Sequence, residues 1–206
     1  MTDNRHAAAS GTSPGPRPGL RERQKAQTRA DIRAAALELF AKQGYESTTV
    51  AQIAARANVS HTTFFRYFQS KEHVVIDDDL DADRKRVLEN LPPGLDQFGL
   101  VRQMLSEMWT ITQSDPWASN PERFAILRTE PALRATFQTE SDRAIAEGLD
   151  FIAAYLGSSP DDPKLRIFVA ALSGVMFHLA ESATEHMLPL AAYLAAIDLM
   201  EEGFPL

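Results

Sequence analysis

The sequence predicts an all-α protein of two domains. Apolar residues recur every three or four positions along most of the chain, which places them on one face of a helix. No segment shows the alternation of apolar and polar residues that is typical of a half-buried strand. Clusters of Pro, Gly, Ser and Asp interrupt the helical pattern at 91–94, 114–121, near Pro131, at 157–163 and before Leu188.

The charge is distributed unevenly along the 206 residues. The net charge is −7, but residues 1–71 carry +6 and residues 72–206 carry −13. Only the front part has the excess of positive charge that attracts phosphate groups. Residues 1–20, rich in Gly, Pro and Ser, are expected to be disordered. The rest is expected to form a DNA-binding domain over 21–72 and a larger helical domain over 73–206.

The composition excludes several classes of function. Without cysteine the chain has no disulfide, thiolate metal site or cysteine nucleophile, which fits a reducing, cytoplasmic location. The N-terminus lacks the apolar core of a signal peptide, and we expect no stretch of roughly 20 apolar residues that could span a bilayer. HExxH, a glycine-rich phosphate loop and a catalytic serine motif are missing from the sequence. We therefore expect no enzyme, no cofactor, no metal and no membrane contact.

Capping signals place the first helices. A helix that starts near Thr28 is expected to end at Gly44, where a left-handed residue is favoured. Thr49 and Gln52 form a capping-box pattern at the start of a second helix. Ser70 can cap a fourth helix in the same way.

The segment 49–68 predicts a helix-turn-helix. Asn58 tolerates a left-handed conformation and Ser60 can cap the next helix, so a tight turn leads into a third helix at about 61–68. Phe64 and Phe68, four residues apart, are expected to be buried. The polar side of that helix is then free to enter a DNA groove.

The outward-facing side chains suit DNA contacts of two kinds. Short hydroxyls and an imidazole can approach base edges, which predicts base contacts from His61, Thr62, Thr63 and Arg66, although Arg66 equally fits a solvent-facing arginine. Phosphate contacts are expected from Thr48, Thr49, Tyr67 and Lys71. A basic run ahead of the domain either enters the minor groove or only keeps the chain soluble; it contains Arg21, Arg23 and Lys25.

The segment "GYESTTVAQIAARANVSHTTFFRYFQSKEHVV" resembles the DNA-binding domain of tetracycline-repressor-like (TetR family) regulators, and the resemblance covers about 28–75. It implies a homodimeric repressor that binds a pseudo-palindromic operator in double-stranded DNA and is released by a small-molecule effector. It also implies core positions at Phe64 and Phe68. The implied DNA contacts are Thr49, Ser60, His61, Thr62, Phe65, Tyr67 and Lys71.

The second domain holds candidates for an effector pocket. Large, adaptable apolar side chains suit flexible ligands, although core packing is the default for each one alone. The candidates are Met104, Met108, Trp109, Phe124, Leu127, Phe137, Phe177 and His178. The stretch "PERFAILRTEPALRATF" (121–137) resembles the C-terminal domain of mycofactocin-system regulators. That resemblance implies an acyl-CoA or other acyl effector, whose anionic part Arg123 and Arg128 could bind.

The last two helices carry regular apolar stripes. Such a stripe is usually core, but the resemblance implies that two helices per subunit form a four-helix bundle between subunits. The predicted dimer residues are Leu165, Phe168, Leu172, Met176, Leu190, Tyr193, Leu194 and Ile197.

Two other classes of function stay open. The acidic string "DDDLDAD" contains Asp77, Asp78 and Asp81, a pattern that can hold Mg²⁺ in an all-helical enzyme. We prefer a solvated helix face that begins a long helix linking the two domains. The other class is a helical protein–protein adaptor, but the basic front end argues against it.

Overall fold

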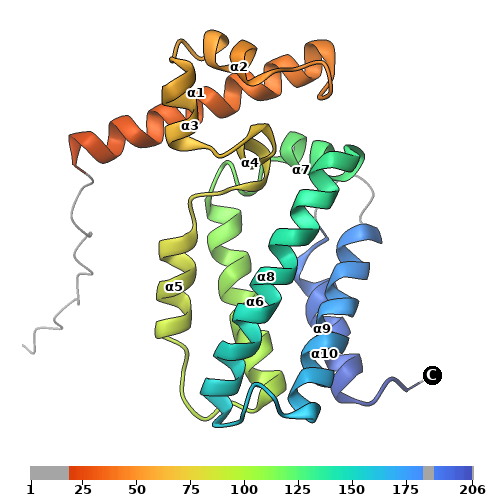
Figure 1. Ribbon diagram of the computed structural model, residues 1–206. Coiled ribbons are helices and arrows are strands. Elements are labelled where there is room, and N and C mark those ends of the chain that lie inside the picture. Colours follow the sequence, from red (N-terminus) through yellow and green to blue (C-terminus); the bar gives the residue numbers. More distant parts are fainter. Residues whose placement is uncertain (1–18, 183–187, 206) are drawn as a thin grey trace, which may run out of the picture.

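The computed structural model describes residues 19–182 and 188–205. These residues form ten helices and no strand, which confirms the all-α prediction. In Figure 1 a small group of helices lies across one end of a bundle of longer helices. The small group consists of α1 (Leu20–Gln43), α2 (Val50–Arg56), α3 (His61–Tyr67) and α4 (Lys71–Ile76). The bundle consists of α5 (Asp81–Glu89), α6 (Gln97–Ser114), α7 (Pro121–Thr129), α8 (Pro131–Leu156), α9 (Pro163–Ser182) and α10 (Leu190–Glu201).

The helix starts in the small domain follow the capping signals. Thr49 and Gln52 form both hydrogen bonds of the capping box, at 3.3 Å and 2.8 Å. Ser60 and Ser70 each accept a backbone N–H from the first turn of the helix that follows. Asn58 has a positive φ of 54°, as the tight turn requires. These local interactions confirm the predicted starts of α2, α3 and α4.

The core of the small domain continues into the bundle. Phe64 and Phe68 are buried in it, as predicted, together with side chains of α1, α2 and α4. Leu127 of α7 and Leu133 of α8 belong to the same core. The proposed domain boundary at residue 72 lies inside α4, whose later residues Val74 and Val75 are fully buried in this core. A second core lies deeper in the bundle around Leu100, Ile152, Ala153, Leu165 and Val169.

Two predicted boundaries were wrong. The helix expected from Thr28 begins at Leu20, because residues 21–27 are mostly good helix formers such as Arg, Glu, Gln, Lys and Ala. No long helix joins the domains: α4 ends at Ile76 and α5 begins at Asp81. The Asp78 carboxylate accepts the backbone N–H of Leu80 at 3.2 Å, which stabilises a turn instead. The expectation of disorder over 1–20 falls, for residues 1–18, outside the described residues.

The helix α9 contradicts one expectation from the sequence. By length and composition it is apolar enough to cross a membrane. Its charged residues Lys164, Arg166 and Glu181 lie near its ends, and its middle is mostly apolar, with Ser173 and His178 as polar residues. Much of that stretch is exposed in the single chain, with Ile167 at 69%.

Candidate nucleic-acid interface

The third helix is fixed by its apolar side and exposes its polar side. Phe64 is fully buried, while Phe65, the next residue, is 46% exposed. His61, Thr62 and Arg66 are exposed on the same outer surface. The imidazole of His61 meets the ring of Phe65 edge-on, with 4.8 Å between centroids. The structure therefore brings these four side chains together on one outward face of α3.

The hydroxyl groups of Ser60 and Thr63 near the turn already form hydrogen bonds within the chain. Ser60 Oγ donates to Thr63 Oγ1 at 2.9 Å and accepts the backbone N–H of Thr63 at 3.0 Å. Thr63 is half-buried, so its first role is to hold the start of α3. Thr49 is exposed at the start of α2 and retains a position suited to a phosphate.

Thr48 does not fit the role predicted for it. Its side chain is buried, with 2% of the residue exposed. The hydroxyl donates to the Gly44 carbonyl at 2.8 Å and accepts from Gln43 Nε2 at 3.2 Å. A side chain that closes the α1–α2 connection in this way does not reach a phosphate. Its neighbour Thr49 is exposed, and its phosphate contact stays a prediction.

Lys71 and Tyr67 are more constrained than an exposed phosphate contact would be. Lys71 Nζ donates to the Tyr45 carbonyl at 2.9 Å and lies 3.9 Å from the centre of the Tyr45 ring. Tyr67 is half-buried, and the Arg66 guanidinium lies 5.2 Å from its ring. An ammonium has three donors, so Lys71 keeps donors for a phosphate while it ties α4 to the α1–α2 connection.

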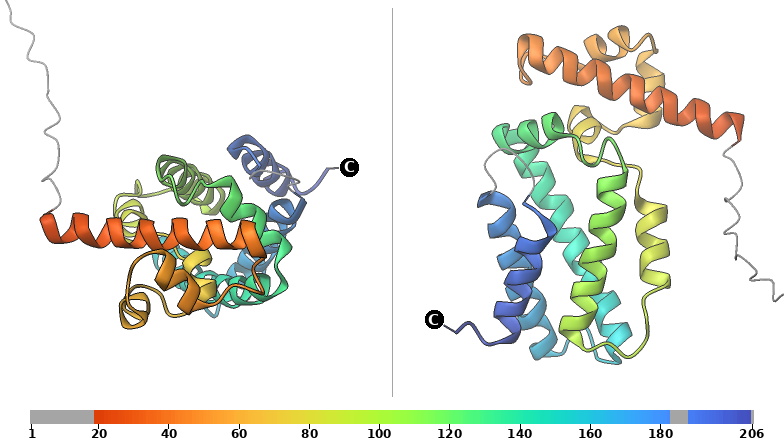
Figure 2. Two further views of the ribbon diagram at one scale, coloured as in Figure 1. Left: turned by 90° about the horizontal axis from the view of Figure 1, so that it is seen from above. Right: turned by 180° about the vertical axis from the view of Figure 1, so that it is seen from behind.

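The basic run ahead of the small domain is helical. Arg21, Arg23 and Lys25 are all exposed in the first turns of α1. Figures 1 and 2 show that this end of α1 extends past the other helices of the small domain. The three cations are therefore displayed on the helical, exposed start of α1, and their entry into the minor groove stays a prediction.

The predicted effector residue Arg123 lies elsewhere, at the junction of the two domains. It is 5% exposed, and its guanidinium donates to the carbonyls of Val75 and Ile76 at 2.6 and 2.7 Å and to that of Ala118 at 3.2 Å. Burial lowers the pKa of Arg123 to about 10, so the group is still charged at neutral pH. Arg123 thus caps the end of α4 from α7 and is not available to an anionic ligand.

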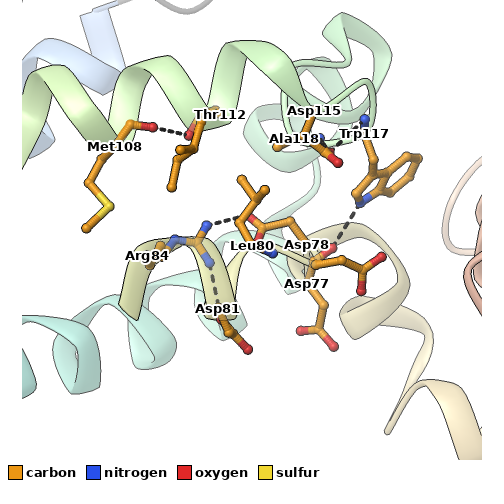
Figure 3. A network of polar contacts seen from close by, with 12 residues as sticks. Asp77, Asp78, Leu80, Asp81, Arg84, Met108, Thr112, Asp115, Trp117 and Ala118 are labelled. Carbon is orange, nitrogen blue, oxygen red and sulfur yellow. Dashed lines mark hydrogen bonds and ion pairs between the residues drawn. The ribbon is translucent and has the colours of Figure 1, made fainter. Parts of the chain in front are cut away.

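Sequence reasoning missed the other parts of this junction. The Trp117 indole N–H and an Arg33 N–H both donate to the Asp77 carbonyl, each at 2.9 Å. The Arg33 and Arg123 guanidinium carbons lie 4.8 and 5.8 Å from the centre of the Trp117 ring. Arg33 of α1 and Trp117 from the loop after α6 therefore hold the same short linker. Figure 3 shows the Trp117 side chain reaching Asp77 from that loop.

Several carboxylates of the aspartate string form ion pairs with arginines. Arg84 contacts Asp78 at 2.5 Å and Asp81 at 3.2 Å, as Figure 3 shows. Asp79 contacts both Arg29 and Arg33 of α1, at 2.7 and 2.8 Å. Burial pushes the pKa of Asp78 upward, but the ion pair with Arg84 outweighs it and the net pKa is lowered. Arg84 thus holds Asp78 and Asp81, two of the three carboxylates of the pattern that could bind Mg²⁺, and the segment forms an ionic contact at the domain junction.

The predicted pocket residues on α6 and α7 pack in different parts of the structure. Met104 packs against the second core, and the Trp109 ring lies 6.1 Å from the Tyr193 ring. Phe124 and Leu127 pack against the core of the small domain. Met108 is half-buried and lies opposite Arg84 in Figure 3. Helical spacing places these side chains on inner faces but does not distinguish a pocket from a core.

The remaining pocket candidates lie at the surface. Phe137 on α8 is 44% exposed and Phe177 on α9 is 42% exposed. His178 and Arg128 are also exposed. None of the four belongs to either buried core.

The residues predicted for a dimer face are buried or half-buried in the single chain. Leu165, Tyr193 and Ile197 are buried, and Phe168 meets Phe98 edge-on with 5.2 Å between ring centroids. Leu172, Met176, Leu190 and Leu194 are half-buried. The most regular apolar stripe of each helix thus packs inwards. The exposed apolar side chains of α9 and α10 lie on the neighbouring face and are Ile167, Ala170, Ala171, Gly174, Phe177, Ala191, Ala195 and Leu199.

Two family profiles match the chain in agreement with this geometry. The profile for bacterial regulatory proteins of the tetR family matches residues 32–77. The profile for the MftR C-terminal domain matches residues 98–205, more than half of the 206 residues. The chain belongs to the tetR family.

Individual relatives of this tetR-family chain agree with that assignment. The HTH-type transcriptional regulator TcmR of Streptomyces glaucescens is 54% identical over 59 residues, which cover 29% of this chain and 26% of TcmR. The match thus spans about a quarter of that relative. The putative mycofactocin biosynthesis transcriptional regulator MftR of Mycobacterium tuberculosis (strain ATCC 25618 / H37Rv) is 26% identical over 168 residues, 81% of this chain and 82% of MftR.

A solved structure shows the same fold. The crystal structure of a TetR-family transcriptional regulator from Streptomyces coelicolor is 20% identical, has a TM-score of 0.50, and covers 87% of this chain and 99% of its own. At this identity the likeness concerns the fold alone. The resemblance inferred from residues 28–75 and from the stretch at 121–137 is confirmed, and the contacts of individual side chains with DNA or an effector stay predictions.

Proposed function

We propose that this tetR-family chain is a transcriptional repressor that binds double-stranded DNA as a homodimer and is released by a small molecule. The observation that carries the proposal is the surface of α3. Its inner side is fixed by Phe64, while His61, Thr62, Phe65 and Arg66 are exposed together on its outer side. A short helix held in this way fits the major groove of B-DNA.

The distribution of charge along the chain also supports a small domain that faces DNA. Residues 1–71 carry +6 on a chain of net −7, so the small domain is the part that phosphates attract. Thr49 at the start of α2 and Lys71 at the start of α4 precede and follow α3 in the chain, which supports phosphate contacts on either side of the groove. In this function the chain acts in the cytoplasm and catalyses no reaction.

The exposed face of α9 and α10 supports dimerisation. Ile167, Phe177 and Leu199 lie among small residues that let two helices approach closely, a composition typical of a buried contact. Two such helices from each subunit would form a four-helix bundle. A partner subunit covers the apolar face of α9 in this arrangement, so the helix needs no membrane. A dimer also presents two α3 helices to half-sites about one DNA turn, roughly 34 Å, apart.

Release requires that the effector and DNA favour different conformations. The junction supplies a mechanical connection, because α4 is held at its end by Arg123 of α7 and its linker by Trp117 from the loop after α6. A shift of α6 or α7 therefore moves α4, and α4 packs directly on α1 in the DNA-binding core. The two α3 helices would then no longer match the half-site spacing.

The experiment for this proposal is a binding assay on duplexes enriched from random DNA by the purified protein. His61→Ala and Thr62→Ala should each change the preferred sequence, at about 1–3 kcal/mol per lost base contact. Lys71→Ala should weaken all sequences alike and reduce the slope of affinity against salt. The control is Lys42→Ala, which removes an exposed charge at the far end of α1. Equal effects of all four changes on every sequence would contradict the division into base and phosphate contacts.

A further inference from the structure

A cleft of about 480 Å³ lies between α5 and α6, outside the residues predicted for an effector pocket. Its volume is within the range of small-molecule sites. Val87 and Leu91 on and just after α5, and Ile111 on α6, supply apolar surface. All three are half-buried, so the single chain leaves part of this surface for a ligand to cover.

The cleft contains two carboxylates but one guanidinium group. Its cation, Arg86, is already paired with Asp83 at 2.7 Å. Its second carboxylate, Glu107 of α6, accepts one hydrogen bond from Gln103 Nε2 at 3.0 Å. Within residues 19–182 and 188–205, no Lys, Arg or His nitrogen is paired with Glu107 by an ion pair of 4.0 Å or less. The cleft therefore presents a half-buried carboxylate next to apolar surface.

We infer that this cleft is the effector site and that it takes a cationic amphipathic molecule. The apolar body covers Val87, Leu91 and Ile111, and the cationic group meets Glu107. An acyl-CoA, which the C-terminal resemblance suggests, carries several phosphates that need unpaired cations. Arg123 is buried against α4, Arg86 is paired with Asp83, and the exposed Arg128 does not line the cleft, so none of the three serves those phosphates in this cleft.

The position of the cleft connects ligand binding to the DNA-binding helices. Asp83 in the cleft precedes Arg84, which holds Asp78 at 2.5 Å in the linker after α4. The carbonyl of the adjacent Asp77 is bound by Trp117 and Arg33. A ligand that separates α5 from α6 therefore displaces the linker that holds α4. This assignment rests on the proposed function, because an effector site needs a DNA complex to release.

The test uses two probes of the same shape and opposite charge, tetraphenylphosphonium and tetraphenylborate. Their affinities for the full-length protein are measured by equilibrium dialysis at low salt. The wild type should bind the cation about tenfold tighter than the anion, as expected for one partly buried carboxylate. Glu107→Gln should lose that preference. Glu89→Gln removes an exposed carboxylate of α5 that does not line the cleft and should keep it.

DNA release separates this inference from the proposed function. DNA affinity without either probe is measured first, and its absence would overturn the proposed function and with it the effector assignment. With DNA binding established, the phosphonium should release DNA from the wild type and Glu89→Gln but about tenfold less effectively from Glu107→Gln. Equal affinity for both probes, no effect of Glu107→Gln, or binding of the cation without DNA release would each overturn the inference while the proposed function stands. Thermal unfolding of Glu107→Gln shows that the variant is folded.

Discussion

Replacing Arg123 by Met tests whether the domain junction holds α4. Hydrogen bonds to a charged group contribute roughly 1.5–3 kcal/mol each, and the guanidinium makes three with backbone carbonyls. Three such bonds sum to about 4.5–9 kcal/mol, which is an upper bound because these contributions are not additive. Removing the charge also removes the desolvation cost of burying it, several kcal/mol. We expect a net loss of about 2–4 kcal/mol in the free energy of unfolding.

The matched control is Arg128→Met, on the same helix one and a half turns later and exposed to solvent. Its cost should be below about 0.5 kcal/mol. Both variants are unfolded with urea at one fixed protein concentration, because the stability of a dimer depends on concentration. Equal losses for the two variants, or a loss for Arg123→Met below about 1 kcal/mol, would refute the claim that this buried arginine holds the end of α4.

Arg123→Met should also separate the two activities of the regulator. The contacts of α3 with DNA do not involve α7, so a folded variant should keep measurable affinity for DNA. The effector should release that variant less effectively than it releases the wild type, because Arg123 joins α7 to α4. Unchanged release would mean that the signal passes through another contact of the junction.

Three further predictions concern other regions. Trp117→Phe, which keeps the ring but removes the indole N–H bond to Asp77, should cost about 1 kcal/mol of stability and also reduce effector release, measured by urea unfolding and DNA displacement. Because the pKa of Asp78 is lowered in the folded state, its contribution to stability is complete above its ordinary value of 3.8 and is lost as the pH falls below it. The stability difference between wild type and Asp78→Asn should therefore shrink on acidification. Ala171→Arg on the exposed face of α9 should give monomers with weaker operator binding in sedimentation and DNA titrations, whereas Ala135→Arg on α8 should not.

The parts of the fold that depend on local sequence could be predicted. The caps at Thr49, Ser60 and Ser70 are formed by residues within three positions, so the starts of α2, α3 and α4 follow from the sequence. The breaks between the bundle helices follow from proline and glycine for the same reason. The extra turns of α1 were missed because a basic run without apolar residues has no helical period to detect.

The side chains that were misplaced depend on contacts distant in sequence. Arg123 binds carbonyls 47 and 48 residues earlier, a connection that no local pattern contains. Thr48 is buried by the way α1 meets α2, which the capping pattern of Thr49 does not indicate. The sequence contained one indication that Arg33 is buried. Arg29 and Arg33 lie on the same face of α1 as the buried residues Ala36 and Phe40. Charged residues in line with a buried stripe indicate a buried ionic contact.

The predicted dimer residues follow the strongest apolar stripes, and their place in a dimer stays a prediction. The most regular apolar stripe of a helix faces the core that its own chain forms, as Leu165 and Ile197 do. A face that meets a second subunit must approach another helix closely, and its small residues give a weaker pattern. Gly174 and Ala195, both exposed in the single chain, are small residues of this kind on the face that we propose for the dimer.

The most direct test of the central claim is the selection of duplexes from random DNA by the purified full-length protein, followed by titration of the winning sequence against salt. We expect a two-fold symmetric sequence. The affinity of the protein for it should fall steeply as the salt concentration rises, because phosphate contacts release counterions. We also expect that His61→Ala selects a different base at one position of each half-site. A folded, dimeric protein that enriches no sequence, or one whose binding is insensitive to salt, would contradict the claim that α3 and its flanking residues form a DNA-binding surface.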